Sequence, residues 1–113
     1  MCIRDRHYTA LGGDGVQATA RVGERVRFRV LNVSPDDSHT FHIHAHRWCT
    51  NAASPAAGGT CPAGSVPEDN TALLPAQGFS MDFVEDNPGD WLYHCHIIDH
   101  MKDGMYAMYH VDE

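Results

Sequence analysis

The chain has 113 residues, which is enough for one β-sandwich domain with a hydrophobic core. Its formal net charge is -7 and it contains no basic run, so nucleic acid is not an expected partner. No apolar stretch is long enough to span a bilayer. Nine histidines are a strong excess for so short a chain and direct attention to metal binding.

The first six residues, MCIRDR, are mostly polar and do not lead naturally into a strand. They resemble the translation of a sequencing adapter, so we expect residues 1–6 to be a non-native lead. Residues 7–113 would then be a single domain and a C-terminal piece of a longer protein. The alternative is a genuine start codon followed by a short lead.

Alternating apolar and polar residues predict β-strands along the chain. A weak strand and a glycine-rich turn are expected over residues 7–16, with further strands over 17–22 and 24–33. In the strand over 24–33, alternate side chains should face the core: Val26, Phe28 and Val30. A turn at 34–38 leads into the next strand, which begins at His39.

The second half of the chain follows the same pattern. Residues 50–70 form a loop that is long for a compact domain, and a short strand is expected over 71–74. The run 79–83 alternates, with three side chains facing inward: Phe79, Met81 and Phe83. The final strand, 105–111, has three side chains on one face: Tyr106, Met108 and His110. Short strands without any helical period predict an all-β, Greek-key β-sandwich.

Two of the cysteines, Cys49 and Cys61, bracket a loop rich in Ala, Gly and Pro. They could form a disulfide, which would suit an oxidising compartment, or remain two free thiols. Geometry decides between these alternatives. Cys2 falls within the expected non-native lead, so Cys95 is the remaining cysteine.

The tripeptide HCH places Cys95 between His94 and His96. Side chains alternate between the faces of a strand, so the two imidazoles point one way and the thiol points the other way. One metal ion cannot use all three side chains, and the tripeptide therefore contacts two sites. His100 and Met105 follow at intervals that allow a loop to fold back to the thiol.

The run HTFHIH also reads as a strand, with His42 and His44 on one face and His39 on the other. His46, two residues after His44, is expected on the same face as His42 and His44. We therefore predict two metal sites. The first is a blue-copper set of one thiolate, two imidazoles and one thioether: His39, Cys95, His100 and Met105. The second is an all-imidazole site: His42, His44, His94 and His96.

These motifs resemble the signatures of the C-terminal cupredoxin domain of the multicopper oxidases, H-x-x-H-x-H and H-C-H-x-x-x-H-x-x-x-x-M. Every ligand position is filled, and the resemblance covers roughly residues 17–111. The amino-acid sequence around these motifs most resembles that of bacterial small laccases and ceruloplasmin-like oxidases. Two positions that are not ligands depart from the commoner pattern, because Thr40 replaces Pro and Ala45 replaces Gly. The family does not use His46 as a ligand, so we expect it to be a polar neighbour.

The resemblance implies a cupredoxin-like fold and a copper-dependent oxidoreductase of laccase type. Four residues would bind type-1 copper: His39, Cys95, His100 and Met105. His42 would bind type-2 copper, and three histidines would bind the type-3 pair: His44, His94 and His96. A small reducing substrate would deliver its electron at His100. The tripeptide His94, Cys95 and His96 would carry it to the cluster that reduces dioxygen to water.

The family's oxygen-reducing cluster needs eight histidines, and this chain supplies four of them. The resemblance therefore implies a partner, another cupredoxin domain that lies upstream in the same gene or on an adjacent subunit. This chain alone would be an incomplete enzyme. The resemblance also implies a secreted or periplasmic protein, and phenols, ferrous iron, cuprous copper and bilirubin-like compounds are substrates used within the family.

Three other interpretations stay open at this point. A single-domain blue-copper electron carrier explains the first site but leaves the four remaining histidines without a role. A copper nitrite reductase domain shares the fold, but that family does not carry the complete HCH tripeptide. A structural zinc or nickel site would use the histidines without redox chemistry. The number of copper ions bound separates these interpretations.

Overall fold

The computed structural model describes residues 17–50 and 61–113. The expected lead at 1–6, the weak strand at 7–16 and part of the long loop lie outside the described residues. The described part contains nine strands and one helix, with these bounds: β1 Ala18–Arg21, β2 Arg25–Leu31, β3 His39–Ile43, β4 Trp48–Cys49, β5 Pro67–Glu68, β6 Asn70–Leu73, β7 Gly78–Val84, β8 Gly89–Cys95, α1 Ile98–Lys102 and β9 Tyr106–Asp112.

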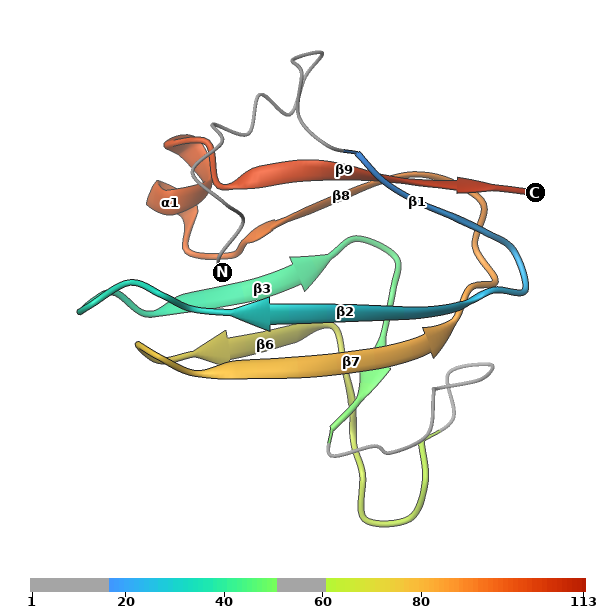
Figure 1. Cartoon of the computed structure of the whole chain (residues 1–113), viewed down its shortest axis with the longest axis horizontal. Coiled ribbons are helices and arrows are strands. Elements are labelled where there is room, and N and C mark those ends of the chain that lie inside the picture. Colours follow the sequence, from blue (N-terminus) through green and yellow to red (C-terminus); the bar gives the residue numbers. More distant parts are fainter. Residues whose placement is uncertain (1–16, 51–60) are drawn as a thin grey trace.

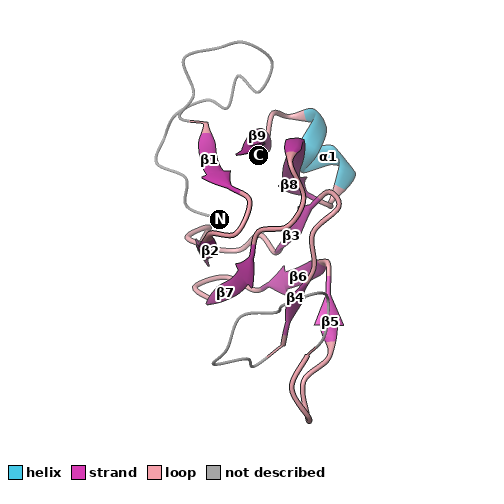
Figure 2. Ribbon diagram, turned by 90° about the vertical axis from the view of Figure 1, so that its right-hand side faces the viewer, coloured by secondary structure: helices cyan, strands magenta, loops and turns pink. Residues whose placement is uncertain are grey.

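The strands form a sandwich of a larger and a smaller sheet (Figure 1). The larger sheet has the order β1-β9-β8-β3-β6, and β2 pairs with β7 in the smaller one. β1 runs parallel to β9, and the other pairs are antiparallel. A short β4-β5 ribbon extends away from the two sheets (Figure 2). This architecture confirms the predicted all-β sandwich.

Aromatic side chains join the two sheets. The ring of Phe28 on β2 lies 6.0 Å from that of Phe41 on β3, 6.0 Å from that of Tyr93 on β8 and 5.5 Å from that of Tyr109 on β9, between centroids. Rings at these distances add to the stabilisation from burial. The core-facing positions predicted on β2 and β7 are confirmed, since all of them belong to or pack against the core: Val26, Phe28, Val30, Phe79, Met81 and Phe83.

The structure differs from the predicted elements at two places near the histidines. β3 ends at Ile43, and Ala45 turns the chain with a φ of 58°, in the left-handed region. His46 therefore lies buried instead of continuing the alternation of the strand, so the predicted parity of His46 is wrong. The loop after the HCH tripeptide contains the five-residue helix α1, which is too short to leave a periodic pattern in the sequence.

The open question about the cysteines is answered by the structure. Cys49 and Cys61 form a disulfide with a Cα–Cα distance of 5.5 Å, and Cys95 is a buried free cysteine. The disulfide joins the end of β4 to the chain that leads toward β5. Among the described residues, no helix has the length and apolar character that crossing a membrane requires.

Candidate metal centre

The pairing of β3 with β8 sorts the metal-binding residues onto two faces. Phe41 lies opposite Cys95, and His42 lies opposite His94. Directly opposed residues share a face of the sheet, so Cys95 points with Phe41 toward the sandwich interior. Burial along β3 alternates as this requires, with His39, Phe41 and Ile43 buried and the residues between them partly exposed.

The inward group consists of His39, Cys95 and His100, whose ligand atoms all lie within 4.8 Å of one another. The Sγ atom of Cys95 is 3.8 Å from Nδ1 of His39 and 3.7 Å from Nδ1 of His100. The two Nδ1 atoms are 3.1 Å apart. One soft sulfur and two imidazole nitrogens therefore converge from β3, β8 and α1 on one point.

Backbone hydrogen bonds hold the loop that completes this group. The N–H of Cys95 donates to the carbonyl of Met105, and the N–H of Met105 donates to the carbonyl of His100, each at 3.0 Å. The main chain of Met105 is thus hydrogen-bonded to that of Cys95 and that of His100, both members of the candidate group. The N–H of Thr40 donates to Sγ of Cys95 at 3.5 Å, so the position that departs from the family pattern contributes through its backbone.

The imidazole of His39 is oriented from its far side. Its Nε2 lies 3.4 Å from Oγ of Ser34, which leaves Nδ1 facing the thiol. Burial lowers the pKa of His39, and nearby His100 acts in the same direction. A lowered pKa keeps the ring neutral near neutral pH, which is the form that binds a metal ion.

The outward group contains His42, His44 and His94, whose ligand atoms also lie within 4.8 Å of one another. Nε2 of His44 is 3.2 Å from Nε2 of His94. The exposed ring of His96 joins them, with its centroid 5.4 Å from that of His42 and 5.5 Å from that of His94. Four imidazoles therefore gather on the outward face of the β3–β8 pair, around the opposed residues His42 and His94.

Main-chain acceptors fix which nitrogen these rings present. Nδ1 of His42 donates to the carbonyl of Asp69 at 2.6 Å, and Nδ1 of His94 donates to the carbonyl of Cys95 at 2.9 Å. In each ring Nε2 is therefore the nitrogen turned away from these carbonyls and available to a metal ion. Burial lowers the pKa of His44, and His42 and His94 act in the same direction, which favours the neutral ring.

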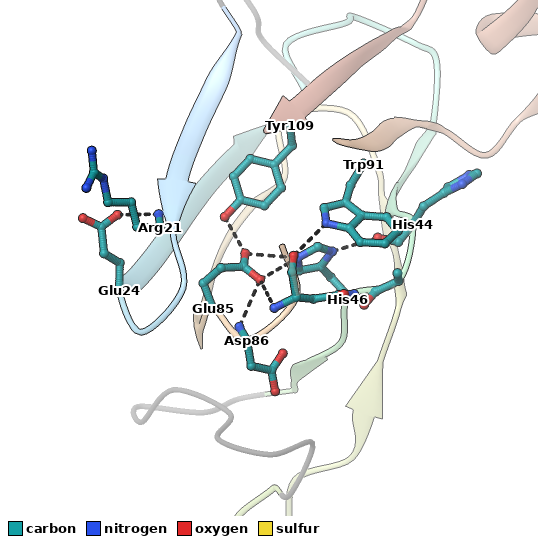
Figure 3. Close-up of polar contacts among 10 residues, drawn as sticks. Arg21, Glu24, His44, His46, Glu85, Asp86, Trp91 and Tyr109 are labelled. Carbon is teal, nitrogen blue, oxygen red and sulfur yellow. Dashed lines mark hydrogen bonds and ion pairs between the residues drawn. The ribbon is translucent and has the colours of Figure 1, made fainter. Parts of the chain in front are cut away.

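Two residues near this group were not predicted as a pair. His46 is buried, with Nδ1 donating to the carbonyl of His44 at 2.7 Å and Nε2 lying 3.0 Å from a carboxylate oxygen of Glu85 (Figure 3). The expectation that His46 is a polar neighbour of the ligands is confirmed by this contact. The sequence does indicate that Glu85 faces inward, because it lies two residues after Phe83 and four after Met81, which are both buried.

Residues 6–113 match the family model described as multicopper oxidase. The chain belongs to the multicopper oxidase family. This membership confirms the resemblance seen in the two histidine motifs. It makes the chain part of a family of copper-dependent oxidoreductases, and copper is the metal that membership implies.

Relatives of this multicopper oxidase chain are much longer proteins. Hephaestin of Mus musculus is 33% identical over 82% of this chain and 7% of its own length. A probable nitrite reductase-hydroxylamine oxidoreductase fusion protein of Kuenenia stuttgartiensis is 31% identical over 83% of this chain and 10% of its own length. The chain therefore spans a tenth or less of these two relatives.

Solved multicopper oxidases share the fold of this chain. A multicopper oxidase from Campylobacter jejuni, described as a metallo-oxidase, superposes with a TM-score of 0.71 over 88% of this chain and 21% of its own, at 23% identity. Fet3p, described as a multicopper oxidase that functions in iron import, has a TM-score of 0.68 over 89% of this chain and 22% of its own, also at 23% identity. Both superpositions support the cupredoxin fold.

The residues present fit copper. Nδ1 of His94 is committed as a donor, so its Nε2 carries a lone pair that faces Nε2 of His44 at 3.2 Å. His44 can meet this lone pair with its own Nε2–H in a neutral hydrogen bond, or both rings can turn their Nε2 lone pairs to one metal ion. At the inward group, the buried thiol of Cys95 between two imidazoles is the soft donor set that copper prefers.

Proposed function

We propose that this chain is the C-terminal cupredoxin domain of a multicopper oxidase and carries type-1 copper together with half of a trinuclear copper cluster. Four residues would bind type-1 copper: His39, Cys95, His100 and Met105. His42 would bind type-2 copper, and three residues would bind the type-3 pair: His44, His94 and His96. One observation carries this proposal. Two neighbouring residues, His94 and Cys95, belong to different candidate metal groups.

The geometry supports a role in oxidation for several parts of the chain. Copper supplies one-electron redox chemistry when it is bound. His100 lies on the short helix and is partly exposed, so a small reducing substrate can approach its ring from solvent. Cys95 continues through its own backbone into His94 and His96. This covalent segment is the proposed path from the thiolate to the imidazoles, where dioxygen would be reduced to water.

The outward imidazoles support the need for a partner domain. His96 and His44 are exposed, and the chain supplies four histidines to a cluster that the family builds from eight. The remaining histidines would come from another cupredoxin domain, upstream in the same gene or on an adjacent subunit. The Cys49–Cys61 disulfide supports an oxidising compartment, in keeping with a secreted or periplasmic protein.

The test is to load the 113-residue chain with copper and measure visible absorption, bound copper and dioxygen consumption with ferrous iron or a phenol. We expect a thiolate-to-copper absorption band and no sustained dioxygen consumption. Addition of a domain that carries the missing histidine pairs should start turnover. Sustained turnover by the chain alone would contradict the proposed need for a partner, and absence of the thiolate band would contradict the type-1 site.

A second candidate function is a nitrite reductase domain, which is favoured by the name of the relative from Kuenenia stuttgartiensis. The single-domain electron carrier is the remaining alternative. Copper analysis separates them, because a carrier would bind one copper ion through this chain, whereas the oxidase would bind further copper once its partner domain is present. A nitrite reductase, once assembled with its partner domain, would consume nitrite in preference to dioxygen.

A further inference from the structure

A buried polar network lies beside His44, one of the outward histidines, and shares no side chain with either candidate metal group (Figure 3). Its three side chains come from separate parts of the fold: His46 after β3, Glu85 after β7 and Tyr109 in β9. All are buried, with 6%, 1% and 1% of their surfaces exposed. Buried polar groups at such positions need a complete set of partners, and this network has them.

The carboxylate of Glu85 is the centre of the network. It accepts hydrogen bonds from the hydroxyl of Tyr109 at 2.6 Å and from the backbone N–H groups of Asp86 and Asn87 at 3.1 and 3.0 Å. Nε2 of His46 completes the set at 3.0 Å. Burial raises the pKa of Tyr109 well above its usual range, so its hydroxyl remains a donor. Glu85 is therefore fixed from several directions.

Two arms lead from Glu85 to the turn that follows His44. Through the first arm, Nδ1 of His46 donates to the carbonyl of His44 at 2.7 Å. Through the second arm, the side-chain amide of Asn87 donates to the carbonyl of Ala45 at 3.2 Å. Asn87 is itself held, because its carbonyl accepts from the indole N–H of Trp91 at 2.8 Å.

The turn needs this support. Ala45 has a φ of 58°, a conformation that side chains other than glycine adopt at an energetic cost. The backbone N–H of His44 donates to the carbonyl of Leu92 at 2.9 Å, so β8 holds one side of this residue. The network holds the opposite, carbonyl side. Together they determine where the ring of His44 lies relative to that of His94.

We propose that Glu85 is a positioning residue for the all-imidazole metal site, and that it acts through His46 and Asn87 to hold the backbone of His44. This inference rests on the proposed function, since it assumes that His44 binds a metal ion. Partners that orient a metal ligand change metal affinity by about 10- to 100-fold when they are removed. A purely structural role would instead change the stability of the fold and leave the relative affinity of the two metal sites unchanged.

The experiment compares copper(II) titrations of the whole chain with those of Glu85→Gln and His46→Leu variants. Absorption of the thiolate–copper bond reports the Cys95 site, and electron paramagnetic resonance reports copper bound only by imidazole. In both variants we expect the affinity of the imidazole site to fall by about 10- to 100-fold while that of the thiolate site is unchanged. His46→Asn should restore most of the affinity, because its amide N–H can replace the donor to the carbonyl of His44.

Asp82→Asn is the matched control. Asp82 lies on β7 three positions before Glu85 and pairs with Arg25 and Arg27, away from His44. This variant should lower stability without changing the ratio of the two copper affinities. If folded Glu85→Gln binds both copper ions as the unaltered chain does, the inference is overturned, and this variant decides the matter even if His46→Leu does not fold. If the unaltered chain binds no copper through imidazole alone, even after addition of a domain that carries the missing histidine pairs, the proposed cluster role fails, and the inference fails with it.

Discussion

His42 on β3 and His94 on β8 are direct partners in the antiparallel ladder, and the next pair along it is Phe41 and Cys95. One step of the ladder thus separates an outward pair of imidazoles from an inward pair made of an aromatic ring and a thiol. A strand can serve two metal sites only if its register with the neighbouring strand is fixed. A slip of one residue would exchange the two faces and destroy both groups.

Replacement of Cys95 by serine tests the division into two sites. We expect Cys95→Ser to remove the thiolate–copper absorption, because serine cannot supply the soft sulfur ligand, while copper bound by imidazole alone is retained. His44→Ala is the complementary variant and should keep the absorption but weaken the imidazole site. Absorption spectra and copper analysis of both purified variants provide the measurement. Loss of both sites in either variant would argue against separate sites.

Ala45 offers a prediction about stability, because it occupies the left-handed region with a φ of 58°. That conformation costs a non-glycine residue about 1–2 kcal/mol, and the greater freedom of glycine in the unfolded chain offsets part of the gain. We expect Ala45→Gly to raise the free energy of unfolding by about 1 kcal/mol. Urea denaturation checks this, with Ala76→Gly at a φ of 62° as the matched control. A similar gain from both variants would assign the effect to backbone conformation.

Acid should destabilise the smaller sheet through Asp82. Its carboxylate accepts from Nε and Nη2 of Arg27, each at 2.6 Å, and from Nη2 of Arg25 at 2.8 Å. The hydrogen bonds from Arg27 hold the pKa of Asp82 well below its usual range. Its contribution to stability is therefore complete above the unfolded pKa, about 3.9, and is lost as the pH falls from there toward the folded pKa.

Urea unfolding of the unaltered chain and of Asp82→Asn between about pH 6 and pH 2 measures this contribution. The unaltered chain should be the more stable at the upper end of that range, and the difference should shrink at the acid end. The sign follows because the unfolded state binds more protons there. A constant difference across the range would show that Asp82 does not titrate with a lowered pKa.

The Cys49–Cys61 disulfide closes a loop with a sequence separation of 12. Replacement of both cysteines by serine should lower the free energy of unfolding by about 2–4 kcal/mol, mainly because the unfolded chain regains freedom. The thiolate–copper absorption should persist, since Cys95 is a separate, free cysteine. Denaturation with and without a reducing agent provides the measurement, and an unchanged stability would contradict a disulfide in solution.

The alternation of side chains along a strand explains why so much of both candidate metal groups was predictable from sequence. The faces of His39 and His42 follow from alternation along β3, and His44 continues it one residue past the end of that strand. Cys95 separates from His94 on β8 by the same rule. The positions of these residues relative to one another depend on one antiparallel pairing. Spacing within each motif sorted its residues onto two faces, and the family resemblance implied that the two motifs share their sites. The pairing of β3 with β8 is what brings the motifs together.

The network around Glu85 could not be predicted in the same way. His46 does not continue the alternation of β3, because Ala45 takes a positive φ and turns the chain. The residue at the turn is not glycine, so the local sequence does not indicate a positive φ there. Glu85 lies 39 positions from His46, and the contact between them exists only after both sheets have assembled. The short helix α1 was missed because its five residues are too few to show a helical period.

Within the described residues, β9 is the one strand that pairs with β1. The paired residues run from Ala18 opposite Tyr109 to Arg21 opposite Asp112. The earliest described strand is thus secured by the last few residues of the chain. Removing the segment after Tyr109 would leave β1 without most of its hydrogen-bonded partner residues, so shortening the chain at its carboxyl end should first release β1 and make it accessible to proteases. A purification tag added after Glu113 would lie close to the parallel pairing of β1 with β9.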